Sequence, residues 1–150
     1  MTRARLMLVL LLTQPATAAL VCGIDAITPV SFGAYDPFDG LPTDAAGSVT
    51  YSCSGALESD SVAIELSAGG AASFAPRQLT SGANTLNYNL YLDAARLSVW
   101  GDGGGTTVRY EASGTGLNGT HEVTIHGRIP AGQNPSAGAY GDGIVVTVAY

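Results

Sequence analysis

The final seven residues of the chain, 144–150, alternate apolar side chains with the period of a β-strand. One face would carry Ile144, Val146, Val148 and Tyr150, and the other Val145, Thr147 and Ala149. Because both faces are mostly apolar, the strand is expected to be covered on both sides or to lie at the centre of a sandwich. Chain termini usually fray, so an ordered strand at this position needs a specific reason to be held.

The rest of the chain repeats this short-strand pattern between clusters of glycine and small polar residues. Residues 85–93 alternate most regularly, with Leu86, Tyr88, Leu90 and Leu92 expected to face inward. No stretch has a convincing helical period. Further strands are expected at 22–33 with an interruption at Pro29, and at 47–54, 61–67, 77–79, 106–112 and 121–129. Many short strands with turns between them predict an all-β sandwich or barrel.

The N-terminus has the pattern of a secretory signal peptide. Two arginines precede an apolar run at 6–12, and an A-x-A cleavage site follows at 16–18. A membrane anchor is the alternative, but the run is much shorter than the roughly 20 residues that a spanning helix needs. We therefore expect residues 1–18 to be a signal peptide and residues 19–150 to form one exported domain.

The composition of the expected mature domain excludes some classes of partner. It keeps all 12 acidic residues but has no lysine. Its only basic residues, histidines aside, are Arg77, Arg96, Arg109 and Arg128. Such an acidic domain is not expected to bind nucleic acid or an anionic membrane by charge, or to insert into a membrane once the signal is removed.

Cys22 and Cys53 are the only cysteines. In an exported chain two cysteines most simply form one disulfide. The alternative, a pair of metal ligands, lacks the two further partners that a tetrahedral site needs. We expect the disulfide, and no metal.

Several motifs that could carry chemistry have a simpler structural interpretation. The glycine run 101–105 lacks the Lys-Ser/Thr of a phosphate-binding loop, so a tight turn is expected. The remaining candidates are the acid pairs Asp36/Asp39 and Glu58/Asp60, the histidines His121 and His126, and the glycosylation sequon at Asn118. The acid pairs lie in turn-rich sequence, the histidines would face opposite ways as surface residues, and the sequon is equally a hairpin turn. No nucleophile, base and orienting group can be named together, so no catalysis and no cofactor are expected.

Three blocks of sequence together resemble a known family. They are FGAYDP at 32–37 with GSVTYSC at 47–53, LNYNLYLDAAR at 86–96 with VWGDG at 99–103, and GRIPAGQ at 127–133 with AGAYGD at 137–142 and the final strand. In this order and spacing they resemble the spore coat protein U domain, the fold of subunits in archaic chaperone–usher pili. The resemblance extends over the whole expected mature domain.

The resemblance implies an immunoglobulin-like β-sandwich that lacks its last strand. In this family a periplasmic chaperone lends a strand to the open groove, and an outer-membrane usher exchanges it for the N-terminal extension of another pilus subunit. By this resemblance the groove would involve Ile144, Val146, Val148, Tyr150 and Phe32. The chain is then expected to pass through the periplasm to a surface fimbria. An unpaired edge next to the final strand would be an aggregation hazard unless it is filled.

One departure from the family pattern concerns the donor segment. Only Ala19, Leu20 and Val21 would separate the cleavage site from Cys22. Because a strand needs roughly five residues, the subunit is expected to accept a donor strand without providing one, which suggests a place at the pilus tip. Three alternatives stay open: a self-contained coat or envelope protein, a lectin-like binding module that uses exposed Tyr or Trp, and a hydrolase that uses Asp36 and Asp39.

Overall fold

The computed structural model of the protein describes residues 18–150. The predicted signal peptide therefore lies outside the described residues, except for Ala18. The described chain is almost entirely strands and turns, with one short 3-10 helix, η1 (Thr115–Leu117). The strands are β1 (Val21–Thr28), β2 (Thr43–Ser54), β3 (Ser61–Leu66), β4 (Arg77–Ser81), β5 (Asn84–Tyr91), β6 (Tyr110–Ser113), β7 (Gly119–Ile129) and β8 (Val146–Ala149).

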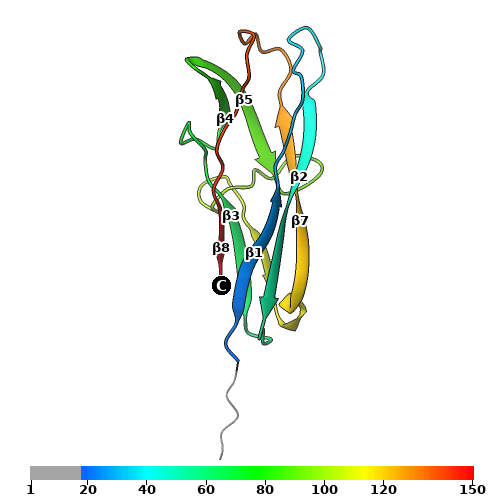
Figure 1. The fold of residues 1–150 in the computed structure, drawn as a ribbon, viewed down its shortest axis with the longest axis vertical. Helices are drawn as coiled ribbons and strands as arrows, with labels where there is room; N and C mark the ends of the chain where they lie inside the picture. The colour runs from blue at the N-terminus through cyan, green and yellow to red at the C-terminus, as the bar shows by residue number, and fades with distance from the viewer. Residues whose placement is uncertain (1–17) are drawn as a thin grey trace, which may run out of the picture.

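The strands form two sheets that pack as a sandwich. One sheet has the order β1-β2-β7-β5-β4 and the other the order β6-β3-β8, and every pairing between these strands is antiparallel. Figure 1 shows an elongated molecule in which β8 runs beside β3, and β1 forms the near edge of the other sheet. This confirms the predicted all-β, immunoglobulin-like sandwich.

The core forms where inward faces of the two sheets meet. Along β3, Val62, Ile64 and Leu66 are buried, while the residues between them are partly exposed. This is the alternation that a strand covered on one side requires. Trp100 is fully buried between the sheets, and its indole Nε1 donates a hydrogen bond to the carbonyl oxygen of Ile64 at 2.9 Å. The indole N–H therefore has the partner that burial demands.

The ends of several strands differ from the sequence prediction. β1 ends at Thr28, directly before Pro29, and no strand resumes up to Gly33, because proline cannot donate to a ladder. β2 begins at Thr43, before the predicted start. β6 begins only at Tyr110, and not at the predicted residue 106. The hydroxyl of Thr107 donates a hydrogen bond to Asp102 Oδ1 at 3.1 Å and so closes the preceding glycine turn.

The position of β8 corrects the expectation of a strand covered on both faces. β8 lies at the edge of its sheet, where it pairs only with β3 among residues 18–150. Its inward residues are half-buried, but Val145 is 64% exposed, and Thr147 and Ala149 also face solvent. A three-stranded sheet without further cover explains why the outer apolar face stays open.

Cys22 and Cys53 form the expected disulfide. The two residues are directly opposite each other in the β1–β2 ladder, with a Cα–Cα distance of 4.1 Å. Both are buried. The bridge thus ties the edge strand β1 to the body of its sheet, and a closed loop of this length stabilises a fold by roughly 3–4 kcal/mol.

Candidate strand-docking groove

The outer edge of β8 presents unpaired backbone groups. The N–H of Ser67 donates to the carbonyl oxygen of Val145 at 2.9 Å, which fixes this pair as hydrogen-bonded. In an antiparallel ladder such pairs alternate, so Thr147 and Ala149 also direct their backbone toward β3. The intervening residues, among them Val146, then direct their N–H and C=O groups away from β3. Within residues 18–150, β8 therefore carries a row of donors and acceptors without a backbone partner on this side.

A second unpaired backbone lies across from it, in residues 29–35. No backbone–backbone hydrogen bond involves these residues within the described part of the chain, and they form no strand. Their side chains nevertheless alternate, because Val30 and Phe32 are half-buried and Ser31 is exposed. The Phe32 ring meets the ring of Tyr88 edge-on, at 6.0 Å between centroids and 74° between planes. Side-chain packing thus holds an extended segment in place without a strand partner.

A groove separates these two backbones and opens onto the core. Its apolar section has a volume of about 280 Å³. The lining of that section is Ile27, Pro29, Val30, Phe32, Leu66, Leu79, Tyr88, Leu90, Ile125, Asp142, Ile144 and Val146. A wider section of about 800 Å³ shares Pro29, Val30, Phe32, Leu79 and Asp142 with it and continues toward Tyr35 and Tyr140. Because five residues line both sections, they form one continuous groove.

The structure brings three of the five residues predicted for the groove together. Ile144, Val146 and Phe32 line it. Val148 lies on the same inward face of β8 and is half-buried against the core, beyond the lined section. Tyr150 is 59% exposed and instead borders a shallow hollow on the outer side of the β6-β3-β8 sheet.

The sequence reasoning missed most of the groove floor. The sequence predicts Leu79 only as part of a short edge strand. The alternation in 85–93 correctly places Tyr88 and Leu90 on the inward face. The sequence predicts no role for Asp142, because a single aspartate in a glycine-rich turn is common and has no distinctive pattern. Only the fold brings this carboxylate next to β5.

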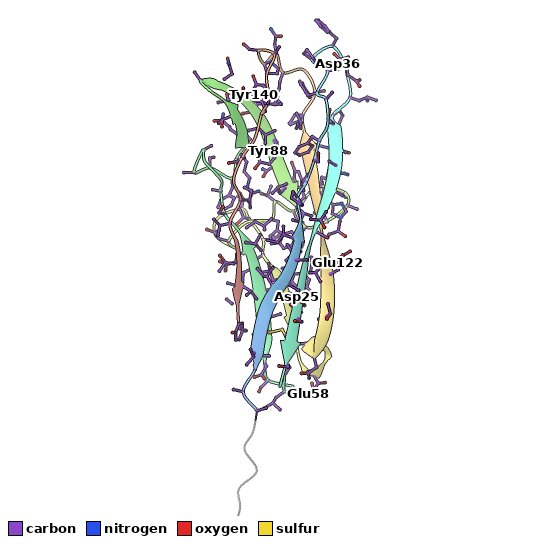
Figure 2. The ribbon with its side chains drawn as sticks, viewed as in Figure 1. Asp25, Asp36, Glu58, Tyr88, Glu122 and Tyr140 are labelled. Atoms are coloured by element: carbon purple, nitrogen blue, oxygen red, sulfur yellow. A yellow bond between two sulfur atoms is a disulfide. The ribbon has the colours of Figure 1, made fainter. Side chains whose placement is uncertain are left out.

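Asp142 joins the wall of the groove to its floor. Its Oδ2 accepts a hydrogen bond from the hydroxyl of Tyr88 at 2.7 Å. Its Oδ1 accepts from the backbone N–H groups of Gly70 and Gly143, both at 2.8 Å. Burial, together with the bond to this carboxylate, raises the pKa of Tyr88 well above its ordinary value, so the phenol stays neutral. Figure 2 shows Tyr88, a residue of β5, in the upper half of the sandwich.

Arg77 supports the start of the β8 wall from inside the core. It is fully buried, and its guanidinium donates to the carbonyl oxygens of Ser67 and Trp100 at 2.8 Å and 2.7 Å and to Asn89 Oδ1 at 2.8 Å. Because the Ser67 carbonyl oxygen already accepts hydrogen bonds from Arg77, the Val145 N–H donates to the Ser67 hydroxyl instead, at 2.9 Å. Burial lowers the pKa of Arg77. These bonds fix the point where the chain turns into β8.

Three of the four acids considered in the sequence bond to their own loops, while Glu58 accepts a hydrogen bond from the hydroxyl of Thr115 at 3.0 Å. Oδ1 of Asp36 accepts from the N–H of Phe38 at 2.9 Å, and Oδ1 of Asp39 from that of Leu41 at 3.0 Å. Asp60 accepts from the N–H of Leu57 at 2.8 Å. These are the turn bonds expected for aspartates of this kind. Figure 2 shows Asp36 and Glu58 at opposite ends of the molecule, so the two pairs do not meet across a cleft.

The structure confirms the turn expected at the glycine run but not the surface position expected for the histidines. The residues around 101–105 form the expected turn, closed by a bond from the Thr107 N–H to the Gly104 carbonyl oxygen at 3.0 Å. His121 corrects the expectation of a surface histidine, because it is half-buried and its ring lies 5.2 Å from that of Tyr51. His126 is half-buried as well. Alternation along β7 places the two at different levels and on different faces of the strand.

The sequon residue Asn118 has a structural role that its sequence context did not reveal. Its Oδ1 accepts from the N–H of Ala56 at 3.0 Å, and its Nδ2 donates to the carbonyl oxygens of Ala56 and Thr115 at 3.1 Å and 3.0 Å. A glycan on Nδ2 would compete with two of these bonds. The side chain instead joins the β2–β3 loop to η1.

Residues 18–150 also bear on metal sites and membrane-spanning helices. Groups of three or more His, Cys, Asp or Glu side chains placed to hold a metal ion do not occur among these residues. The same residues contain no helix with the length and apolar character needed to cross a membrane.

Comparison with known proteins identifies the family. A family model described as the Spore Coat Protein U domain matches residues 7–147. The chain belongs to the Spore Coat Protein U domain family. Protein U of Myxococcus xanthus is 32% identical over 131 residues, a match that covers 81% of this chain and 71% of that protein. The family predicted from the three sequence blocks is thus confirmed.

A solved structure has the same fold as this family member. It is a crystal structure of the CsuC–CsuE complex, a chaperone–tip adhesion subunit pre-assembly complex from archaic chaperone–usher Csu pili of Acinetobacter baumannii. The TM-score is 0.58 at 20% sequence identity, and the match covers 88% of this chain. This chain spans 40% of the length of the solved chain. At this identity the likeness concerns the fold.

Proposed function

We propose that this chain is a non-enzymatic structural subunit of a surface pilus or fimbria, and that it accepts a strand from another polypeptide in its groove. The observation that carries the proposal is the pair of unpaired backbones that face each other across the groove. Residues 29–35 form one side and the outer edge of β8 the other. An extended segment lying between them would find hydrogen-bonding groups on both sides and an apolar floor beneath.

The apolar floor supports strand addition as the way in which the sandwich is completed. Ile27 is 47% exposed, and Val30, Phe32, Ile144 and Val146 are only half-buried where they line the groove. A free exported domain gains by covering such apolar surface, at roughly 25 cal/mol for each Å² removed from water. An alternating strand supplies apolar side chains at the spacing of two residues that a β-groove accommodates.

The family and the fold support a proposal of assembly by a chaperone and an usher. In the solved relative, the similar fold belongs to a complex described as chaperone and tip adhesion subunit. We propose the same route here: export to the periplasm, a strand lent by a pilus chaperone, exchange at an outer-membrane usher for a strand of a neighbouring subunit, and display at the cell surface. The tip position rests on cleavage after Ala18 and stays a prediction.

A self-contained coat protein is the second candidate, because the family carries the name of a spore coat protein. A coat protein of this kind would be stable by itself and would need no strand from outside. Its apolar groove would then be covered by a copy of the same chain or stay open.

The test uses two adjacent residues of opposite orientation. Val146 lines the groove, whereas Val145 is 64% exposed on the outer face. The full chain, its Val146→Arg variant and its Val145→Arg variant are each produced in the bacterial periplasm with a pilus chaperone from the source organism, and complexes are isolated by pull-down. We expect one-to-one complexes for the wild-type chain and Val145→Arg, and loss of the complex for Val146→Arg.

The outcomes separate the candidates. Disulfide formation, checked by gel mobility without reductant, shows that each variant has folded. A complex that survives Val146→Arg unchanged would contradict strand docking at this groove. A wild-type chain that accumulates alone, with a cooperative thermal transition unaffected by the chaperone, would favour the self-contained coat protein.

A further inference from the structure

We infer that the strand that enters this groove carries a lysine or arginine aimed at Asp142, with aliphatic side chains at the inward positions on the β8 side of it. This inference rests on the proposed function and names the chemistry of the partner. Its starting point is the location of Asp142, which lines both sections of the groove and is the only charged residue in the lining of either.

The carboxylate has capacity for another hydrogen bond. Its Oδ1 is fully engaged, because two backbone N–H groups bind it. Among the residues that the structure describes, its Oδ2 has a single partner, the hydroxyl of Tyr88. A carboxylate oxygen accepts about two hydrogen bonds, so Oδ2 can receive a donor from the groove side. Asp142 is partly exposed and lines the groove.

The described chain has no cation free to provide this donor. Arg96 and Arg128 both contact Asp44, and Arg109 contacts Glu65 and Glu111. Arg77 is close enough for its charge to interact with that of Asp142, but within residues 18–150 it forms no ion pair, and its guanidinium bonds to neutral oxygens. A cationic side chain in direct contact with Asp142 must therefore come from the molecule that fills the groove.

Filling the groove favours this partner, although the carboxylate already accepts three hydrogen bonds within the chain. A strand over the floor would remove water from Asp142, and a carboxylate that loses its water without a compensating donor is strongly unfavourable. A purely apolar strand would incur that cost, whereas a lysine or arginine at the matching position replaces the lost water with a charge-assisted hydrogen bond. Asp142 would thereby set the register of the incoming strand, since a shift of one residue turns every side chain to the other face.

The two sections of the groove define the rest of the partner. Beyond Asp142 toward β8, the lining of the narrower section is apolar, which suits valine, leucine or isoleucine. On the other side of Asp142 the groove is wider and is bordered by Tyr35, Tyr140 and a run of small residues at 136–139. The expected occupants are therefore segments in which a basic residue is followed, on the β8 side, by aliphatic inward residues.

A peptide scan tests the inference. The probes are labelled 13-residue peptides of alternating valine and threonine, in which each inward valine in turn is replaced by lysine, by acetyl-lysine or by methionine. Binding to the exported chain is measured by fluorescence anisotropy. At one inward position we expect the lysine peptide to bind about tenfold or more tightly than the methionine peptide, with acetyl-lysine behaving like methionine.

Variants of the protein assign the preference to one carboxylate. Asp142→Asn should abolish the preference for lysine at that position. Glu122→Gln, on the outer face of β7 as Figure 2 shows, should leave it unchanged. Peptides that bind without any position favouring lysine over methionine and acetyl-lysine would overturn the inference and leave strand docking intact. If no peptide in the panel binds, strand docking itself fails, and this inference fails with it.

Discussion

Tyr88 contacts both walls of the groove at once. Its hydroxyl donates to Asp142 Oδ2 at 2.7 Å on the β8 side, and the edge-on contact with Phe32 lies on the other side. Because Tyr88 is itself 3% exposed in β5, the rigid core sets the distance between the two walls. The width that an incoming strand meets is thus determined by one buried aromatic residue.

Tyr88→Phe should lower the free energy of unfolding at neutral pH by about 1–3 kcal/mol, because it removes a hydrogen bond to a charged and partly buried acceptor. Urea unfolding monitored by tryptophan fluorescence measures this change. Tyr140→Phe is the control, since its hydroxyl bonds the Ser136 carbonyl oxygen at an exposed site. Equal effects of the two substitutions would contradict the importance of the Tyr88–Asp142 bond.

The same residue gives a prediction for alkaline pH. The folded state holds the pKa of Tyr88 above its ordinary value of 10.0, chiefly through burial. A raised pKa means that the neutral phenol contributes stability that is fully present below about pH 10 and is lost as the pH rises further. The stability advantage of the wild-type protein over Tyr88→Phe should therefore shrink above pH 10. An advantage that stays constant up to pH 11.5 would contradict this.

The sequence predicted the fold more completely than it predicted the groove. Strict alternation located most strands, including the inward Tyr88 and Leu90, because burial on one face imposes a period of two. The position of β8 at an edge could not be deduced from its own residues, since Val145, Thr147 and Ala149 look as suitable for burial as their neighbours do. Only the count and order of strands in a sheet decide which faces are covered.

The residues that join distant segments were the hardest to predict. Asp142 bonds a tyrosine 54 positions away, and Asn118 bonds Ala56, 62 positions away. Local sequence does not explain the contact of Asp142, because the aspartates Asp36 and Asp39 bond their own turns. Such long-range bonds follow from the topology and not from a motif.

Arg77→Lys should destabilise the protein by about 2–4 kcal/mol although the charge is kept. Lysine cannot reproduce the fork that reaches Ser67, Asn89 and Trp100 together, so buried acceptors lose their donors. Thermal unfolding followed by circular dichroism measures the loss. Arg109→Lys is the matched control, because that side chain is 42% exposed and its ion pairs are worth little. A loss at Arg77 as small as that at Arg109 would contradict the proposed support of the β8 wall.

Asn118→Ala should lower the free energy of unfolding by about 1–3 kcal/mol, because the N–H and the carbonyl oxygen of Ala56 would both lose their hydrogen-bond partners. Thr120→Ala destroys the glycosylation sequon but leaves these bonds in place, and Thr120 is exposed. We expect that variant to stay within about 0.5 kcal/mol of the wild type. Comparable losses for the two variants, measured by urea unfolding of protein from the same host, would show that the sequon and not the bonds of Asn118 matters.

Asp44→Asn should reduce the sensitivity of the fold to acid. Asp44 accepts two hydrogen bonds from Arg128, at 2.7 Å and 2.8 Å, and lies 3.3 Å from Arg96. The bond from Arg128, assisted by the charges of both arginines, lowers the pKa of Asp44 below the ordinary 3.8, although partial burial opposes the shift.

A lowered pKa contributes stability above the unfolded-state value and loses it as the pH falls below about 3.8. The wild-type protein should thus lose more stability than Asp44→Asn between pH 5 and pH 2. The difference should be at most about 1 kcal/mol, because the side chain of Asp44 is 33% exposed and solvent screens the pair. Glu122→Gln, which removes an exposed carboxylate from the face of β7 that carries Arg128, is the control. If Asp44→Asn and Glu122→Gln follow the same acid profile in urea unfolding, the contacts from Arg128 and Arg96 contribute nothing to the stability of this sheet.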